Sequence, residues 1–228
     1  MTLLPALLLT FTLIATGLYA NTPPNAKVII DRMIIAYGGE HNIQKLNAYE
    51  QFWNIETKTT DTNGTDERMV MIPNSLSTKL VYPNKTEVRM LHNQYGSKTF
   101  DQQTIRAKGP MLDAMKLQLM RLYHPLVLQN KLRNISASED AKDYILTLKE
   151  GSLRAQYFVS KETYLIEKVV GKLSMGGQPM EFVTLYDDYR AIKGVMVPYK
   201  EVKYAGSVNT AVMHLQKMHF LAAPKIRH

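Results

Sequence analysis

Residues 109–124, GPMLDAMKLQLMRLYH, stand between two strand-rich parts of the sequence and decide how its fold is interpreted. Gly109 and Pro110 are typical of a helix start, since proline is favoured at the first helical position. The helix is expected to run to about His124, because Pro125 disfavours helix in the residue before it. Apolar residues cover most of the circumference of this helix: Met111, Leu112, Ala114, Met115, Leu117, Leu119, Met120 and Leu122.

Alternating apolar and polar residues on both sides of this helix predict antiparallel strands. Asn63-Gly64 is a strong signal for a hairpin turn between the first two strands. With no repeat and no linker, the sequence predicts one α+β domain. Its core is a strongly curved antiparallel sheet of about 10–11 strands, an incomplete β-barrel whose concave face is plugged by helices. The expected strands are 47–58, 68–72, 76–82, 88–90, 97–105, 144–149, 153–160, 164–173, 179–186, 195–204 and 208–220.

A second apolar helix is predicted near the N-terminus. Pro23-Pro24 and Asn25 supply its start, and Gly38-Gly39 supply its stop. A short further helix is expected from Glu40 to Leu46. Because the first of these helices is apolar on nearly all sides, it should be buried on more than one side or border a cavity. Its broad apolar face and the narrower opposite stripe comprise Ala26, Ile29, Ile30, Met33, Ile34, Ala36 and Tyr37, and then Val28 and Ile35.

Residues 1–20 contain no charged side chain, and Leu3 to Leu18 is nearly continuously apolar. The run is shorter than the ~20 apolar residues of a membrane-spanning helix, and small and polar residues follow it, as in a secretory signal peptide. The alternative is an uncleaved N-terminal anchor. Either interpretation takes residues 21–228, the expected mature domain, out of the cytoplasm. A cysteine-free exported domain suits the bacterial periplasm.

Composition excludes several classes of protein. The absence of cysteine rules out a disulfide scaffold, thiolate zinc sites, iron–sulfur clusters, cysteine nucleophiles and a lipidated cysteine. The net charge is +8, but the basic residues are scattered and form no run. This pattern fits a soluble basic surface or weak, transient contact with anionic lipid headgroups. Export and the lack of a basic stripe argue against nucleic acid as a partner.

A curled sheet with two apolar helices on its concave face can leave space for an apolar ligand. Methionine is flexible, so a methionine-lined cavity tolerates varied apolar cargo, and each buried CH₂ of an acyl chain contributes about 0.8 kcal/mol. The alternative is that the same residues form a dry core. The residues expected to line such a cavity are Ile30, Met33, Ile34, Tyr37, Tyr49, Trp53, Leu80, Tyr82, Met90, Met111, Met115, Leu119 and Leu122.

Three local patterns match those of one known family. The first is the N-terminal helix that ends in Tyr37-Gly38-Gly39 and is followed by a short helix and a strand. The second is Tyr157–Ile166, YFVSKETYLI, a strand–turn–strand segment after the central helix. The third is Tyr186–Arg190, YDDYR, followed by Gly194-Val195 and Pro198 in a late hairpin.

With these patterns, the sequence from about Asn25 to Phe220 resembles the periplasmic lipoprotein-carrier superfamily, the LolA/LolB-like or outer-membrane lipoprotein-sorting proteins. The resemblance implies an incomplete antiparallel barrel, closed by helices around a hydrophobic cavity that binds acyl chains without catalysis. It also implies lipid or lipoprotein cargo, in sorting or lipid transport. Relatives of this kind serve as glycolipid carriers or envelope-stress sensors. The best-known carriers use an arginine and a lid helix in transfer, and no arginine here is assigned to that role.

Catalytic and cofactor motifs are missing from the sequence. It contains no Gly-x-Ser-x-Gly, His-Glu-x-x-His, Walker or EF-hand pattern, so neither an enzyme, a metal site nor a cofactor is expected. The second interpretation is an envelope sensor or interaction module that receives a protein or peptide in its groove. The third is a small hydrolase with an unrecognised site, for which Asp188 and His214 are the residues to test.

Overall fold

The computed structural model describes residues 24–175 and 177–222. The expected signal peptide and its cleavage site lie outside these residues. Within them, no helix is both long enough and apolar enough to span a membrane.

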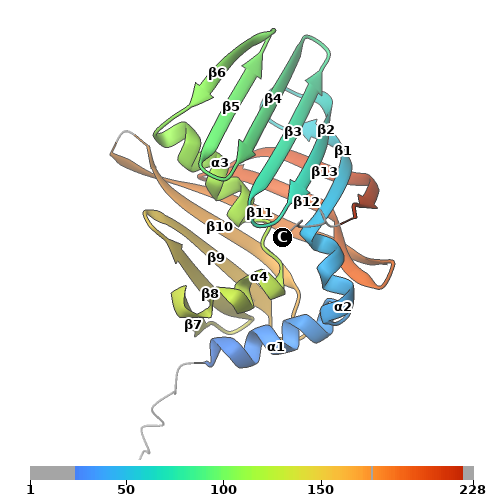
Figure 1. The fold of residues 1–228 in the computed structure, drawn as a ribbon, viewed down its shortest axis with the longest axis vertical. Helices are drawn as coiled ribbons and strands as arrows, with labels where there is room; N and C mark the ends of the chain where they lie inside the picture. Colours follow the sequence, from blue (N-terminus) through green and yellow to red (C-terminus); the bar gives the residue numbers. More distant parts are fainter. Residues whose placement is uncertain (1–23, 176, 223–228) are drawn as a thin grey trace, which may run out of the picture.

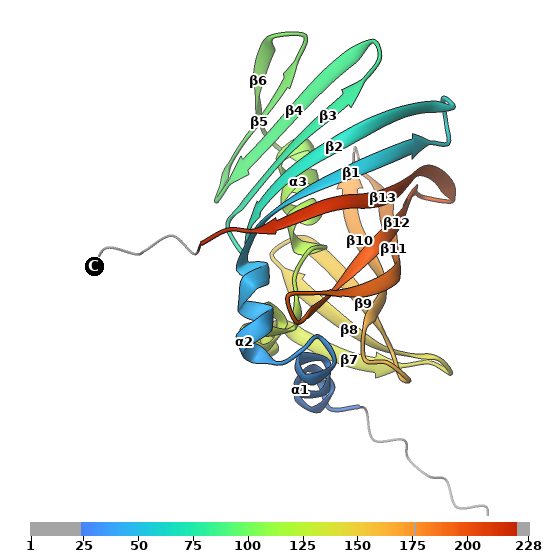
Figure 2. The same ribbon diagram turned by 90° about the vertical axis from the view of Figure 1, so that its right-hand side faces the viewer.

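Within this part of the chain, thirteen antiparallel strands form one continuous sheet in the order β6-β5-β4-β3-β2-β1-β13-β12-β11-β10-β9-β8-β7. The sheet curls strongly but its edge strands, β6 and β7, do not pair, so the barrel is incomplete (Figures 1 and 2). The strands are β1 Ala48–Thr57, β2 Thr62–Met71, β3 Ser75–Tyr82, β4 Lys85–His92, β5 Tyr95–Phe100, β6 Gln103–Ala107, β7 Ile135–Glu139, β8 Asp143–Glu150, β9 Leu153–Ser160, β10 Ile166–Met175, β11 Gln178–Ile192, β12 Val195–Ala205 and β13 Val208–Phe220.

The predicted α+β fold is confirmed, but the expected number of strands is too low. Asp101 and Gln102 take left-handed φ angles of 45° and 69°, and this turn divides the expected strand 97–105 into β5 and β6. The edge strand β7 was not expected at all, because its sequence, Ile-Ser-Ala-Ser-Glu, is short and mostly exposed.

The hairpin between β1 and β2 has its turn earlier than predicted. Residues 58–61 form the turn, whereas Asn63 already lies in β2, opposite Glu56. Gly64 has a different role from the one its Asn-Gly context suggests. A Cβ on Gly64 would lie 2.6 Å from Cδ1 of Tyr82, so the glycine makes room for the Tyr82 ring on the inner face of the sheet.

Helices connect the two halves of the sheet and cover its hollow side. The central helix α3 ends at Met120 rather than near His124, because Pro125 begins a separate helix and His124 has an extended backbone (φ −87°, ψ 169°). The helical elements are α1 Ala26–Ala36, α2 Glu40–Ile43, the 3₁₀ turn η1 Gln44–Asn47, α3 Pro110–Met120, α4 Pro125–Asn130 and the 3₁₀ turn η2 Leu132–Asn134.

Helix α1 has the predicted start and stop. The Asn25 side chain accepts a hydrogen bond from the backbone N–H of Lys27 at 2.9 Å, and the helix ends just before Gly38. A Cβ on Gly38 would lie 2.0 Å from the carbonyl oxygen of Gly194, so only glycine fits there. The narrower apolar stripe is not covered, since Val28 and Ile35 are 50% and 76% exposed. The expectation that the helix is buried on more than one side is therefore wrong for this stripe.

Helix α3 lies across the hollow side of the sheet (Figure 2). Its last carbonyl groups are held by two tyrosines, because the Tyr157 hydroxyl donates to the Met120 carbonyl at 2.6 Å and the Tyr186 hydroxyl donates to the Arg121 carbonyl at 3.0 Å. These hydrogen bonds satisfy carbonyls that a helix end leaves without partners. The C-terminal end of α3 is thereby fixed to β9 and β11.

Candidate functional site

A groove of about 600 Å³ lies between α3 and the inner face of the sheet. Its walls come from β1–β5 on one side and from β11–β13 on the other, with α3 along its length. Apolar surface dominates the lining. The apolar and aromatic residues that line it are Ile55, Leu80, Tyr82, Met111, Ala114, Met115, Leu117, Phe182, Tyr204, Ala205, Ala211 and Met213.

Polar residues form a row across the inner face of the same sheet wall. Strand register places Arg68 opposite Thr78, Thr78 opposite Arg89, and Arg89 opposite Lys98. These four residues belong to neighbouring strands β2–β5, and Arg68, Arg89 and Lys98 line the groove. The groove therefore has a cationic strip set into a mainly apolar surface.

A buried ion network holds the Arg68 end of this strip. Arg68 is 3% exposed, and its guanidinium donates to both carboxylate oxygens of Glu201, at 3.0 and 3.1 Å. Its Nε donates to Asp66 at 2.6 Å, and its guanidinium carbon lies 5.0 Å from the centre of the Trp53 ring. Burial opposes the charge of Arg68, but Glu201 and Asp66 outweigh it and raise its pKa. This cation is fully compensated.

Lys203 is the second partner of Glu201, with an Nζ–Oε2 distance of 2.8 Å. Burial disfavours ionisation of Glu201, but the charges of Arg68 and Lys203 outweigh burial and lower its pKa to about 2. Burial lowers the pKa of Lys203 to about 8, and Glu201 offsets only part of this effect. One carboxylate thus serves two cations.

Arg121 follows α3 and lines the groove without a carboxylate partner among the described residues. Its Nη1 donates to the Thr184 hydroxyl at 3.2 Å, and its Nε is buried with no hydrogen-bond partner. Thr184 stands opposite Lys203 in the β11–β12 ladder, so Arg121 approaches the buried network from the helix side. Burial lowers the pKa of Arg121.

Glu87 compensates the outer end of the strip. It forms ion pairs with both Arg89 and Lys98, the latter at 3.1 Å. Burial would raise the pKa of Glu87, but the two cations outweigh burial and lower it. Three carboxylates among the described residues, Asp66, Glu87 and Glu201, pair with the cations of the groove. The cations number five: Arg68, Arg89, Lys98, Arg121 and Lys203.

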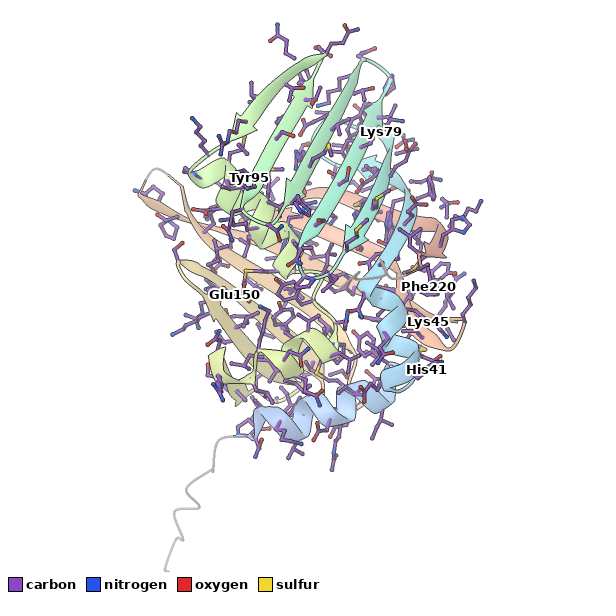
Figure 3. All side chains as sticks on the ribbon, in the orientation of Figure 1. His41, Lys45, Lys79, Tyr95, Glu150 and Phe220 are labelled. Carbon is purple, nitrogen blue, oxygen red and sulfur yellow. The ribbon has the colours of Figure 1, made fainter. Side chains whose placement is uncertain are left out.

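Four of the residues expected to line a cavity do line this groove: Leu80, Tyr82, Met111 and Met115. A polar hollow of about 470 Å³ on another side of α3 includes Leu119 together with Lys116, Lys131 and Glu150. Glu150 is labelled in Figure 3. A small hollow of about 70 Å³ includes Tyr37, Tyr49 and Leu122. The structure therefore divides these eight of the thirteen expected residues among three separate spaces.

The remaining expected residues lie elsewhere. Ile30, Met33 and Trp53 are at most 1% exposed and belong to the packed core, and Ile34 is partly buried against that core. Met90 is 55% exposed and lies on the outer face of β4. The expectation that Met90 faces inward is wrong, because the inward positions of β4 are Glu87, Arg89 and Leu91.

Sequence reasoning missed the charged residues of the groove. The sequence signal for them is the alternation of inward and outward residues along a strand. In β12 the buried Val195 and Val197 are odd-numbered, and Glu201 and Lys203 continue the same series. Charged residues are usually assigned to the solvent side of a strand, and that rule fails here. Within residues 24–175 and 177–222, no three His, Asp or Glu side chains converge in a way that could hold a metal ion.

Two solved structures share this architecture. A LolA superfamily protein from Nitrosomonas europaea aligns with a TM-score of 0.57 and 12% identity, over 88% of this chain and 96% of its own. The fold is LolA-like. A domain described as an outer membrane lipoprotein-sorting protein from Vibrio parahaemolyticus aligns with a TM-score of 0.50 and 7% identity, over 88% of this chain and 94% of its own. No protein-family model matches the sequence, and no curated protein matches it significantly.

The comparison confirms the resemblance that the sequence suggested, at the level of the fold. Both related structures align over nearly their whole length, so the LolA-like fold accounts for the curled sheet and its helices together. The fold is thus shared with a domain described as an outer membrane lipoprotein-sorting protein.

Proposed function

We propose that this chain is a non-catalytic binding protein of the bacterial envelope, exported to the periplasm, whose groove beside α3 shields the acyl part of a lipid or lipoprotein. The observation that carries the proposal is the groove itself. It has a volume of about 600 Å³ and a mainly apolar lining, and it lies on the concave side of a LolA-like sheet. This volume is in the range of about 300–1,000 Å³ typical of small-molecule sites.

The methionines of α3 support an acyl ligand. Met111, Ala114 and Met115 line the groove from one face of the helix, as expected for residues spaced three and four apart. Met111 is 38% exposed, so apolar surface is available to a ligand without unfolding of the helix. Flexible methionine side chains can adapt to acyl chains of different shape.

The polar residues that were considered for catalysis lie outside the groove, which favours a binding function for the groove. Ser75 and His92 are hydrogen bonded at 2.7 Å, but both lie on the outer face of the sheet. Asp188 is engaged by Arg190 at 2.6 and 2.9 Å, and His214 is exposed, 3.9 Å from Glu56. Neither Asp188 nor His214 lines the groove.

The test compares two methionines that are both partly exposed. Met111→Asp places a carboxylate in the groove, at the start of α3, where the helix dipole favours a negative charge and the fold should persist. We expect binding of the neutral fluorescent probe N-phenyl-1-naphthylamine to weaken about tenfold or more. Met90→Asp, on the outer face, is the matched control and should leave binding unchanged.

Mass spectrometry of the purified mature protein provides a second measurement, since lipid should co-purify with the wild type and be depleted in Met111→Asp. A protein that carries no lipid and does not bind the probe would contradict the proposal. A stoichiometric protein partner from envelope extracts, in the absence of lipid, would instead support the interaction-module interpretation.

A further inference from the structure

The groove has more cationic than anionic groups. Five cations, Arg68, Arg89, Lys98, Arg121 and Lys203, line it, and three carboxylates, Asp66, Glu87 and Glu201, pair with four of them. Among the described residues these groups therefore carry a net formal charge of +2, and Arg121 is the cation that pairs with no carboxylate. In a partly buried, mainly apolar space an uncompensated cation is costly, because burial disfavours charge without a partner.

The lack of a partner is clearest at Arg121. Among the described residues its hydrogen-bonded contact is a neutral one, the Thr184 hydroxyl, and its buried Nε has no partner at all. Arg68 and Lys203 share the Glu201 carboxylate, and Arg121 donates to Thr184, which stands opposite Lys203, so the three cations lie near one another. A guanidinium with free donors beside an ammonium group is suited to bind a carboxylate or phosphate.

The groove face of α3 changes from apolar to polar along the helix. Met111, Ala114 and Met115 are followed on the same face by Gln118, and Arg121 comes after the last turn. Ten residues of helix correspond to about 15 Å. An amphiphile with one chain and one charged end could match this order of side chains over its length.

We infer that the groove binds an anionic amphiphile with a single alkyl chain, whose carboxylate or phosphate group contacts Arg121 and Lys203 and whose chain lies along Met111 and Met115. This inference rests on the proposed function and narrows its ligand. The uncompensated charge of the groove favours an anionic group, and the apolar face of α3 favours a chain.

The experiment measures displacement of N-phenyl-1-naphthylamine by three ligands with the same chain: dodecanoate, dodecyl phosphate and the neutral 1-dodecanol. Charge-assisted hydrogen bonds should make at least one anionic ligand bind about tenfold or more tightly than 1-dodecanol. Arg121→Gln should abolish that preference, and Arg121→Lys, which retains the charge, should restore much of it. Lys79→Gln is the control, because Lys79 is an exposed cation on β3 (Figure 3) paired with Glu67 at 3.4 Å.

The outcomes separate this inference from the proposed function. Equal binding of all three ligands would overturn the anionic preference and leave the apolar groove in place. Failure of the probe and of every ligand to bind would overturn both. Acetate or inorganic phosphate as competitive as the chain-bearing anions would show a free-anion site and overturn the amphiphile. Tighter binding of dodecanoate would indicate a fatty-acid source, and tighter binding of dodecyl phosphate a phospholipid source.

Discussion

Helix α3 meets two different walls of the same sheet. On one side it packs against β9 and β10, where the inward residues Ala155, Tyr157 and Val169 are fully buried. On the other side it faces β2–β5, where the inward positions hold Arg68, Arg89 and other charged groups. The first interface is closed, and the second contains the groove.

This difference shows how a sheet with one alternating pattern produces both a core and a binding space. Apolar inward side chains let a helix approach to packing distance, and Gly171 on β10 even allows Leu117 to contact the backbone. Charged inward side chains keep their hydrogen bonds with one another and cannot be covered by an apolar helix without loss. The helix therefore comes close to this wall at Gly96 of β5 and leaves the groove beside the charged residues.

The largest effect is expected from a substitution that tests whether the ion network stabilises the charged wall. Glu201→Gln removes the carboxylate shared by Arg68 and Lys203 and leaves buried positive charge uncompensated. We expect the free energy of unfolding to fall by about 3–5 kcal/mol in urea denaturation. Glu67→Gln, the same change in an exposed pair with Lys79, should cost at most about 1 kcal/mol. Equal small losses would show that the network does not stabilise this wall.

A second effect, of intermediate size, is the dependence of stability on pH that we expect from the buried His124. His124 is 5% exposed at the start of α4, its Nε2 lies 3.0 Å from Oδ1 of Asn47, and burial lowers its pKa to about 4. The unfolded chain takes up a proton near the ordinary pKa of 6.5, whereas the folded chain resists protonation down to about 4. Stability should therefore decline as pH falls from about 6.5 to about 4, by about 3 kcal/mol in total.

Urea denaturation across this pH range measures the contribution of His124. His124→Gln should remove most of the decline, whereas His214→Gln, at an exposed position, should retain it. Glu201 acts in a lower range, since its pKa of about 2 makes stability fall only below its ordinary value of 4.5. If the His124 variant declines as steeply as the wild type, the histidine is not the cause of this acid sensitivity.

The smallest expected effect compares the two walls directly through a pair of glycines that face α3. A Cβ on Gly171 would lie 2.9 Å from Cγ of the buried Leu117, whereas a Cβ on Gly96 would lie 3.0 Å from the flexible ends of Leu112 and Met115. We expect Gly171→Ala to lower the free energy of unfolding by about 1–3 kcal/mol. Gly96→Ala should cost less than about 1 kcal/mol, because Met115 can move into the groove. The reverse order would contradict the idea that α3 packs more closely against β10.

Local signals predicted much of the fold. Asn25 and Gly38 defined α1 correctly, and alternation located most of the strands. The LolA-like resemblance followed from three short patterns, and the solved structures confirm it for the fold. These features succeed because capping, turns and period-2 patterns depend on neighbouring residues alone.

The groove was harder to predict, because its residues depend on which face of a strand turns inward. Met90 appeared to be the inward residue of β4 because it is apolar, yet Arg89 occupies the groove. The charge of Arg89 is compensated by Glu87, which also pairs with Lys98 from a neighbouring strand. Burial of charge in pairs is a property of the assembled sheet, so hydropathy along one strand does not reveal it.

The unclosed sheet also bears on how this molecule behaves among copies of itself. A closed barrel has no free strand edge, whereas this one presents two, β6 and β7, each only five residues long. Short edges expose few backbone donors and acceptors to another chain, and flanking charges such as Lys108 and Asp140 discourage strand addition. The architecture can thus keep a hollow side open while giving little opportunity for edge-to-edge aggregation.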